Sequence, residues 1–196
     1  MINKRPKYKT DGLPSAQGLY NPQNEHDACG VGMVVNIKNR ATYEIVSKGL
    51  AMLCNLEHRG AVGADPKAGD GSGLLIQIPH KFLKKKIASD FILPDVGDYA
   101  VGVIFMPKEK NNQEKIKNLI KENCLKEGFD ILGWRLCPTQ TGDLGWSVLP
   151  STPDVFQIFV KRPENKKTRD DFERGLYILR RCIEESVVNI SDKIQE

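Results

Sequence analysis

The sequence predicts a mixed fold of the α+β class, in which helices cover one or more sheets. Short apolar runs that suit buried strands alternate along the chain with longer segments whose apolar residues recur every three to four positions. Several of these runs are apolar on both faces, and such strands need helices packed against them to exclude water. A chain of 196 residues is long enough to bury a core of this kind.

Cys29 marks the boundary between a polar tail and the folded part of the chain. Residues 1–28 are rich in Pro, Gly, Asn, Gln and Lys, so we expect a propeptide-like tail that is extended or loosely docked. The alternating run "CGVGMVVNI" at 29–37 predicts a strand, and the apolar stripe of 42–57 predicts a helix. The domain is therefore expected to occupy residues 29–196.

The middle of the chain predicts a loop followed by strands and a short helix. Residues 60–72 are rich in glycine and predict a loop. The apolar runs at 73–79 and 99–106 predict buried strands, and the basic segment 80–88 between them predicts a helix.

Residues 112–160 predict one helix and two further strands. The amphipathic segment 112–128 predicts a helix that ends at Gly128, a residue type that suits a left-handed C-terminal cap. Apolar runs at 129–136 and 155–160 predict strands, and the proline-containing segment between them predicts a long loop.

A final helix is predicted to begin near Thr168, because Thr168 and Asp171 have near capping-box spacing. Its apolar stripe consists of Phe172, Leu176, Leu179, Ile183 and Val187. The sequence then ends at "NISDKIQE" without a closing element, which suggests a domain interrupted in mid-course.

Composition favours a cytoplasmic protein that binds neither nucleic acid nor a membrane. The net charge is only +4 and the lysines are spread along the chain. No apolar stretch approaches the roughly 18 residues of a membrane span, and the basic N-terminus lacks the apolar core of a secretory signal. Five cysteines, an odd number with no tandem CxxC, fit a reducing compartment better than a disulfide framework.

Cys29 admits two interpretations. A free cysteine is usually a small buried hydrophobic residue. A catalytic cysteine needs a base, and neither His26 nor His58 forms a recognised pairing with it. Cleavage after Ala28 would create another base, because the new α-amine of Cys29, with a pKa of about 8, could accept the thiol proton.

A metal site is the competing interpretation of this region. Cys54 and His58 are four positions apart on the predicted helix, and His26 and Cys29 could complete four ligands. These spacings match no zinc pattern, so a metal is not expected. We expect Cys54 and Cys124 instead to pack in the core.

Two short motifs have both a structural and a functional interpretation. The loop "ADPKAGDGSG" resembles a phosphate cradle but lacks the GK[ST] ending, so we favour a loop near a small-molecule site. In "EHRG", the cationic His58 and Arg59 suit a helix C-terminus and Gly60 suits its cap. Arg59 and Gly60 could equally line a cleft.

Four segments together resemble one known family. They are "DACGVG", "LCNLEHRGAVGADPKAGDGSGLLIQIPHKF", "LGWRLCP" and "FERGLYILRRCIE". They resemble the start of the large chain of glutamate synthase, its glutaminase domain. That domain is a class II glutamine amidotransferase of the N-terminal-nucleophile hydrolase type. The resemblance extends from about residue 20 onward.

The resemblance implies a four-layer αββα sandwich and a catalytic role for Cys29. After removal of the tail, the thiolate of Cys29 would attack the side-chain amide of L-glutamine, with its own α-amine as base. Arg59 and Gly60 match positions that bind substrate or support the transition state. Asp70 and Gly71 match a site loop.

The resemblance also implies a larger enzyme. FMN and an iron–sulfur cluster would bind beyond residue 196, and the ammonia would feed amination of 2-oxoglutarate, with electrons from ferredoxin or a partner subunit. The family's HxRYSTN-like and HNGEIN-like segments do not occur among these 196 residues, so the chain alone is expected to be inactive. The alternative is a catalytically inactive truncated remnant or an interaction module.

Overall fold

The computed structural model describes most of the chain after the N-terminal tail. The described residues are 15–19, 21, 30–56, 60, 64–69 and 71–194, with side chains described to residue 188. They divide into two compact units. The first unit comprises Met1–Ile76 and Asp143–Pro150, and the second comprises Gln77–Gly142 and Ser151–Glu196.

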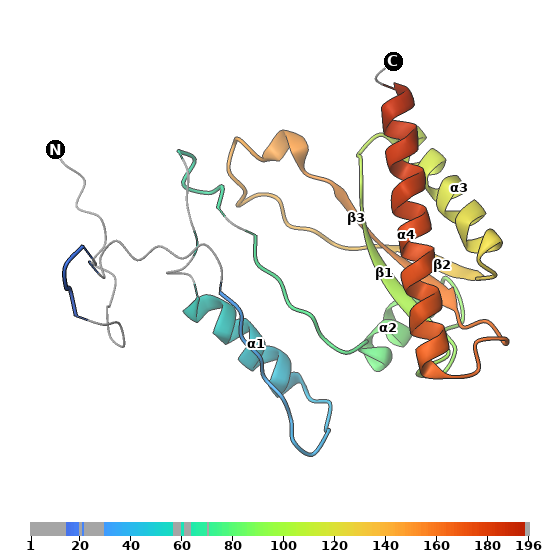
Figure 1. The fold of residues 1–196 in the computed structure, drawn as a ribbon, viewed down its shortest axis with the longest axis horizontal. Coiled ribbons are helices and arrows are strands. Elements are labelled where there is room, and N and C mark those ends of the chain that lie inside the picture. Colours follow the sequence, from blue (N-terminus) through green and yellow to red (C-terminus); the bar gives the residue numbers. More distant parts are fainter. Residues whose placement is uncertain are drawn as a thin grey trace. The chain divides into compact units, whose positions relative to one another are not determined.

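The second unit is built on a three-stranded antiparallel sheet (Figure 1). Its strands are β1 (Tyr99–Met106), β2 (Ile131–Leu136) and β3 (Asp154–Lys161). The spatial order is β1-β3-β2, so β3 is central and forms hydrogen bonds along both edges. The three strands predicted in this part of the sequence are confirmed.

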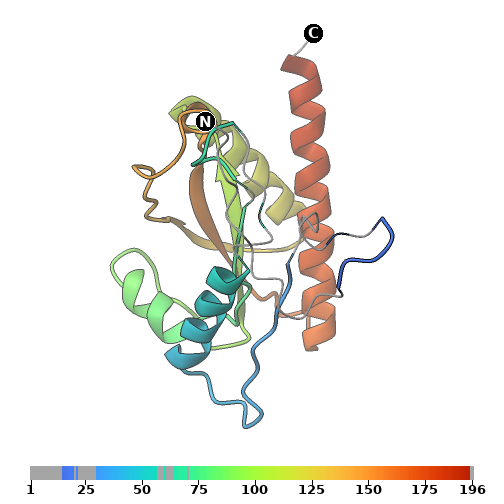
Figure 2. The ribbon, with the colours of Figure 1, turned by 90° about the vertical axis from the view of Figure 1, so that its left-hand side faces the viewer.

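One face of the sheet is covered by two helices, α3 (Lys110–Lys126) and α4 (Arg169–Ile194), which lie on the same side of it (Figure 2). The cluster buried between the helices and the sheet comprises Met106, Ile120, Cys124, Phe129, Phe156, Ile158, Val160, Phe172 and Leu179. Asn123 of α3 and Ser186 of α4 add a polar contact, in which Nδ2 donates to Oγ at 3.2 Å. The expected covering of a sheet by helices is confirmed on this face.

Within the described residues of the second unit, the opposite face is covered at one end only. Leu83 of α2 (His80–Lys86) and the following Ile87 and Leu93 pack there around Phe159 of β3. The Phe91 ring contacts the Phe159 ring edge to face, with centroids 5.2 Å apart. Farther along β1, side chains that alternate onto this face are exposed. They are Val103, 57% exposed, and Phe105, 70% exposed.

Gly128 ends α3 as predicted. Its backbone has φ of +74°, the left-handed conformation that glycine adopts without a steric cost. The Phe129 amide donates to the Cys124 carbonyl at 2.8 Å, and the Gly128 amide donates to the Leu125 carbonyl at 3.2 Å. These two bonds form a Schellman motif that satisfies the last carbonyls of the helix.

The predicted cap of α4 is also present. The Asp171 amide donates to Thr168 Oγ1 at 3.1 Å, and the Thr168 hydroxyl donates to the Asp171 carboxylate at 2.6 Å. These bonds with Thr168 lower the pKa of Asp171. The cap therefore fixes where the helix begins.

α4 is amphipathic rather than apolar throughout. Of its predicted stripe, Phe172 and Leu179 are buried, Leu176 and Ile183 pack partly against the core, and Val187 is exposed. Charged side chains occupy its other faces and form i, i+3 and i, i+4 ion pairs, such as Arg180 with Glu184. No helix within the described residues is both long and apolar enough to cross a membrane.

The first unit contains the predicted N-terminal helix as α1 (Tyr43–Asn55). Gly49 is the buried residue of α1, and a Cβ added there would lie 3.1 Å from Leu74 Cδ2. Before the helix, the Asn36 side chain accepts hydrogen bonds from the amides of Lys38 and Arg40 and closes a turn. Glycine at position 49 therefore lets residue 74 approach the helix backbone.

The strands predicted at 29–37 and 73–79 are wrong for the described residues, because 30–37 and 73–79 lie outside any helix or strand. Their apolar side chains are mostly exposed, with Ile37 at 99% and Leu75 at 102%. Alternation of apolar residues marks a segment that can form a strand. A strand also needs a neighbour that accepts and donates its backbone hydrogen bonds.

Replacing Phe159 by alanine tests the packing of the sheet face that α2 and the segment after it cover. Phe159 is fully buried, so we expect Phe159→Ala to lower the free energy of unfolding by about 3–5 kcal/mol. The matched control is Leu125→Ala on α3, a site that is 65% exposed, with an expected change within about 0.5 kcal/mol. Urea unfolding measures the change in the free energy of unfolding of each variant. Equal changes in the two variants would contradict the assigned core.

Candidate functional site

The structure describes two of the five predicted site residues. Cys29, Arg59 and Asp70 lie outside the described residues, as do His26 and His58. Gly60 and Gly71 are described, and both are exposed. A Cβ added at Gly71 would meet no atom within 4 Å. The described residues therefore do not bring the predicted site together.

The cysteines differ from one another in exposure. Cys124 is buried in the core as predicted, and burial raises the pKa of its thiol to about 11, which disfavours the thiolate. The prediction that Cys54 packs in the core is wrong, because Cys54 is exposed. It lies five positions after the buried Gly49, about 140° around the helix.

No metal site is found in the described part of the chain, where no group of three or more His, Cys, Asp or Glu side chains could hold an ion. The metal interpretation of the sequence depended mainly on His26, Cys29 and His58. All three lie outside the described residues. Cys54, its fourth ligand, has no such group around it in the described residues.

A polar cluster in the described part of the first unit centres on Asp65. The Asp65 residue is buried, with 5% exposure. Its Oδ2 accepts bonds from the Ser147 amide at 2.9 Å and the Ser147 hydroxyl at 2.8 Å, and its Oδ1 accepts one from the Lys67 amide at 3.1 Å. The bond from the Ser147 amide is the main cause that lowers the pKa of Asp65.

Gly145 completes this cluster by leaving room for the carboxylate. A Cβ added at Gly145 would lie 2.3 Å from Asp65 Oδ2, a distance that no side chain tolerates. The Gly145 amide donates to the Lys67 carbonyl at 3.3 Å. Sequence reasoning singled out the loop that contains Asp65 but not this contact, because Ser147 lies 82 positions away.

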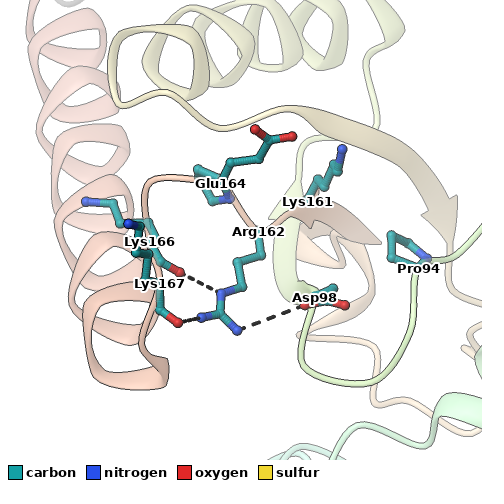
Figure 3. Close-up of a pocket in the computed structure, with 8 residues that line it drawn as sticks. Pro94, Asp98, Lys161, Arg162, Glu164, Lys166 and Lys167 are labelled. Atoms are coloured by element: carbon teal, nitrogen blue, oxygen red, sulfur yellow. Dashed lines mark hydrogen bonds and ion pairs between the residues drawn. The ribbon is translucent and has the colours of Figure 1, made fainter.

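A separate cavity of about 450 Å³ lies in the second unit, at the end of β3 (Figure 3). Arg162 occupies its centre, where its Nε donates to the Lys166 carbonyl at 2.7 Å and another guanidinium nitrogen donates to the Lys167 carbonyl. Nη1 lies 4.0 Å from Asp98 Oδ1. Because the guanidinium already forms these hydrogen bonds and this ion pair, Arg162 holds the 162–168 loop closed and is not available to bind an anionic ligand.

The sequence matches the family described as "Glutamine amidotransferases class-II" over residues 29–195. It is 42% identical over 172 residues to the large chain of the NADPH glutamate synthase of Bacillus subtilis, which covers 88% of this chain and 11% of that protein. It is 40% identical over 184 residues to the NADH glutamate synthase of Saccharomyces cerevisiae, covering 86% of this chain and 8% of that protein. It is 36% identical over 186 residues to the ferredoxin-dependent glutamate synthase 2, chloroplastic, of Arabidopsis thaliana, covering 93% of this chain and 11% of that protein.

The chain belongs to the class II glutamine amidotransferases, a family with the N-terminal-nucleophile hydrolase fold whose general reaction is the hydrolysis of glutamine. Within that family, its relatives are glutamate synthases at 34–42% identity. The chain spans about a tenth of the length of these relatives. The described helices and small antiparallel sheet are compatible with part of such a domain.

The titration of Asp65 tests the cluster that holds it. The pKa of Asp65 is lowered in the folded state. Its contacts therefore stabilise the fold at pH values above the ordinary aspartate pKa of 3.8, and this stabilisation is lost as the pH falls through the lower pKa of the folded state. We expect carboxyl-carbon NMR to give a midpoint below 3.8 for Asp65. Ser147→Ala should move the midpoint upward, and a midpoint at or above 3.8 in the parent would contradict the geometry.

Proposed function

We propose that this chain is the glutamine-hydrolysing part of a glutamate synthase. The observation that carries the proposal is the family match, which begins at Cys29 and continues to residue 195. The relatives that support the narrower assignment are glutamate synthases with different electron donors, NADPH, NADH and ferredoxin. In the complete enzyme, the ammonia released from L-glutamine would aminate 2-oxoglutarate.

In the proposed mechanism, residues 1–28 are removed so that Cys29 becomes the N-terminus. Its α-amine accepts the thiol proton, and the sulfur attacks the side-chain amide carbon of glutamine. The tetrahedral oxyanion collapses, the C–N bond breaks, and the protonated amine gives its proton to the departing ammonia. Water then cleaves the γ-glutamyl thioester to release glutamate. A reducing cytoplasm would keep this thiol free.

The other proposed site residues support this chemistry. Arg59 and Gly60 would bind substrate or stabilise the transition state, and Asp70 and Gly71 would belong to a loop that borders the site. The resemblance to the family at these positions supports their assignment. The family's segments that bind the substrate carboxylate and form the oxyanion hole do not occur among these 196 residues. The 196 residues by themselves would then be inactive.

The proposed domain fold is a four-layer αββα sandwich. It is supported by the second unit, where α3 and α4 cover one sheet face and the other face keeps exposed apolar residues. Val103 and Phe105 on that face suit contact with a second sheet. FMN and an iron–sulfur cluster would be bound by other domains of the synthase, with electrons from ferredoxin or a reducing subunit.

Replacing Cys29 by serine tests the nucleophile. In the complete synthase that carries this chain, we expect Cys29→Ser to lower glutamine-dependent activity below about a thousandth of the parental rate, because a hydroxyl is a far weaker nucleophile than a thiolate. Ammonia-dependent synthesis should survive. The matched control is Cys54→Ser, which removes an exposed thiol and should change neither activity. Full glutamine-dependent activity in Cys29→Ser would refute the assignment.

The N-terminal residue of the active enzyme tests the proposed base. Intact-mass and peptide mass spectrometry should find Cys29 as the first residue, because only cleavage before it creates a free α-amine on the nucleophile. Blocking the cleavage by replacing Ala28 with a bulky residue should leave Met1 in place and the glutaminase silent. An active glutaminase that retains Met1 is incompatible with this mechanism.

A further inference from the structure

Asp65 lies in the sequence between residues proposed to form the site. Asp65 lies six positions after Arg59 and five before Asp70, between two proposed site residues. The sequence from 60 to 73 contains five glycines, which allow many backbone conformations. Ordering a glycine-rich sequence costs conformational entropy, which contacts from elsewhere in the chain can offset.

The Asp65 side chain supplies that contact within a defined turn. The Ala68 amide donates to the Asp65 carbonyl at 3.0 Å, which closes a β-turn with Pro66 at its second position. The Lys67 amide donates to the same residue's carboxylate. Asp65 therefore shapes residues 64–69 locally, before any contact with the rest of the first unit.

The second half of the contact comes from residues 143–150. Both the amide and the hydroxyl of Ser147 donate to Asp65 Oδ2, and Gly145 packs against the carboxylate without a side chain. A buried carboxylate that accepts three hydrogen bonds has one well-defined position, since moving it would leave these donors unpaired. The turn at 64–69 is thereby fixed to the 143–150 segment.

We propose that Asp65 is a positioning residue for glutamine hydrolysis, which holds the turn at 64–69, between the proposed site positions 60 and 71, in the conformation that accepts the substrate. This role rests on the function proposed above. Asp65 itself would contact neither glutamine nor Cys29, because its carboxylate is buried and fully engaged by Ser147 and Lys67. Its effect would pass through the backbone that leads into Asp70 and Gly71.

The test compares three variants of the complete synthase. Asp65→Asn replaces one acceptor oxygen by a donor that faces other donors. Ser147→Ala removes one bond of the cluster and keeps the amide bond, and Ser147→Thr retains the hydroxyl and serves as the conservative rescue. The matched control is Asp95→Asn, which removes an exposed carboxylate in the second unit.

Two rates of Cys29 alkylation distinguish a loss of substrate positioning from a general loss of structure. An electrophilic diazoketone analogue of glutamine alkylates Cys29 only through the bound state, whereas iodoacetamide alkylates any accessible thiolate. In Asp65→Asn we expect alkylation by the analogue and kcat/KM for glutamine to fall by about a hundredfold, a loss that a misplacement of about 1 Å can cause. Alkylation of Cys29 by iodoacetamide and ammonia-dependent synthesis should stay at the parental rates.

The graded variants keep the test decisive if Asp65→Asn does not fold. Ser147→Ala should then show a smaller loss of analogue alkylation with an unchanged iodoacetamide rate, and Ser147→Thr should restore the parental value. Parental kinetics in Asp65→Asn, or an equal loss of both alkylation rates in Ser147→Ala, would overturn the positioning role alone. A parent enzyme that hydrolyses no glutamine and whose Cys29 resists the analogue would overturn the proposed function and this role together.

Discussion

The burial of β3 on both of its faces is the constraint on which the second unit depends. Phe156, Ile158 and Val160 face the helices α3 and α4, while Phe159 faces the layer formed by α2 and the segment that follows it. A strand buried in this way must satisfy its backbone groups along both edges, and pairing with β1 and β2 does so. The order β1-β3-β2 follows from this need. The connection from β2 to β3 also supplies residues 143–150 to the first unit, where they hold Asp65.

The sequence predicts well those elements whose signals are local. The helices α1, α3 and α4 follow from apolar periodicity, and α2 follows from a short basic segment between two apolar runs. The caps at Gly128 and Thr168 follow from residue types with specific backbone roles. The predicted strands at 29–37 and 73–79 fail, because pairing depends on a partner that periodicity does not identify. The prediction that Cys54 is buried fails for a related reason, since the buried stripe of a helix depends on what packs against it.

The candidate site is predictable from the sequence only in part. Cys29 stands out at a change of composition, but neither His26 nor His58 forms a recognised pairing with it in the sequence. Its proposed base is created by cleavage of the chain, and a cleavage event leaves no periodic pattern. The resemblance to a known family supplied Arg59, Gly60, Asp70 and Gly71. The contact of Asp65 with Ser147 required the structure, because two polar residues 82 positions apart carry no common local signal.

Direct trapping of the covalent intermediate tests the central claim, that Cys29 hydrolyses glutamine through a thioester. The complete synthase would be mixed with L-glutamine, quenched in acid within its first turnover, digested and analysed by mass spectrometry. The account predicts a peptide that begins at Cys29 and carries one γ-glutamyl group on sulfur, which hydroxylamine removes. A γ-glutamyl group on another residue, or steady glutamine hydrolysis by enzyme that retains residues 1–28, would contradict it.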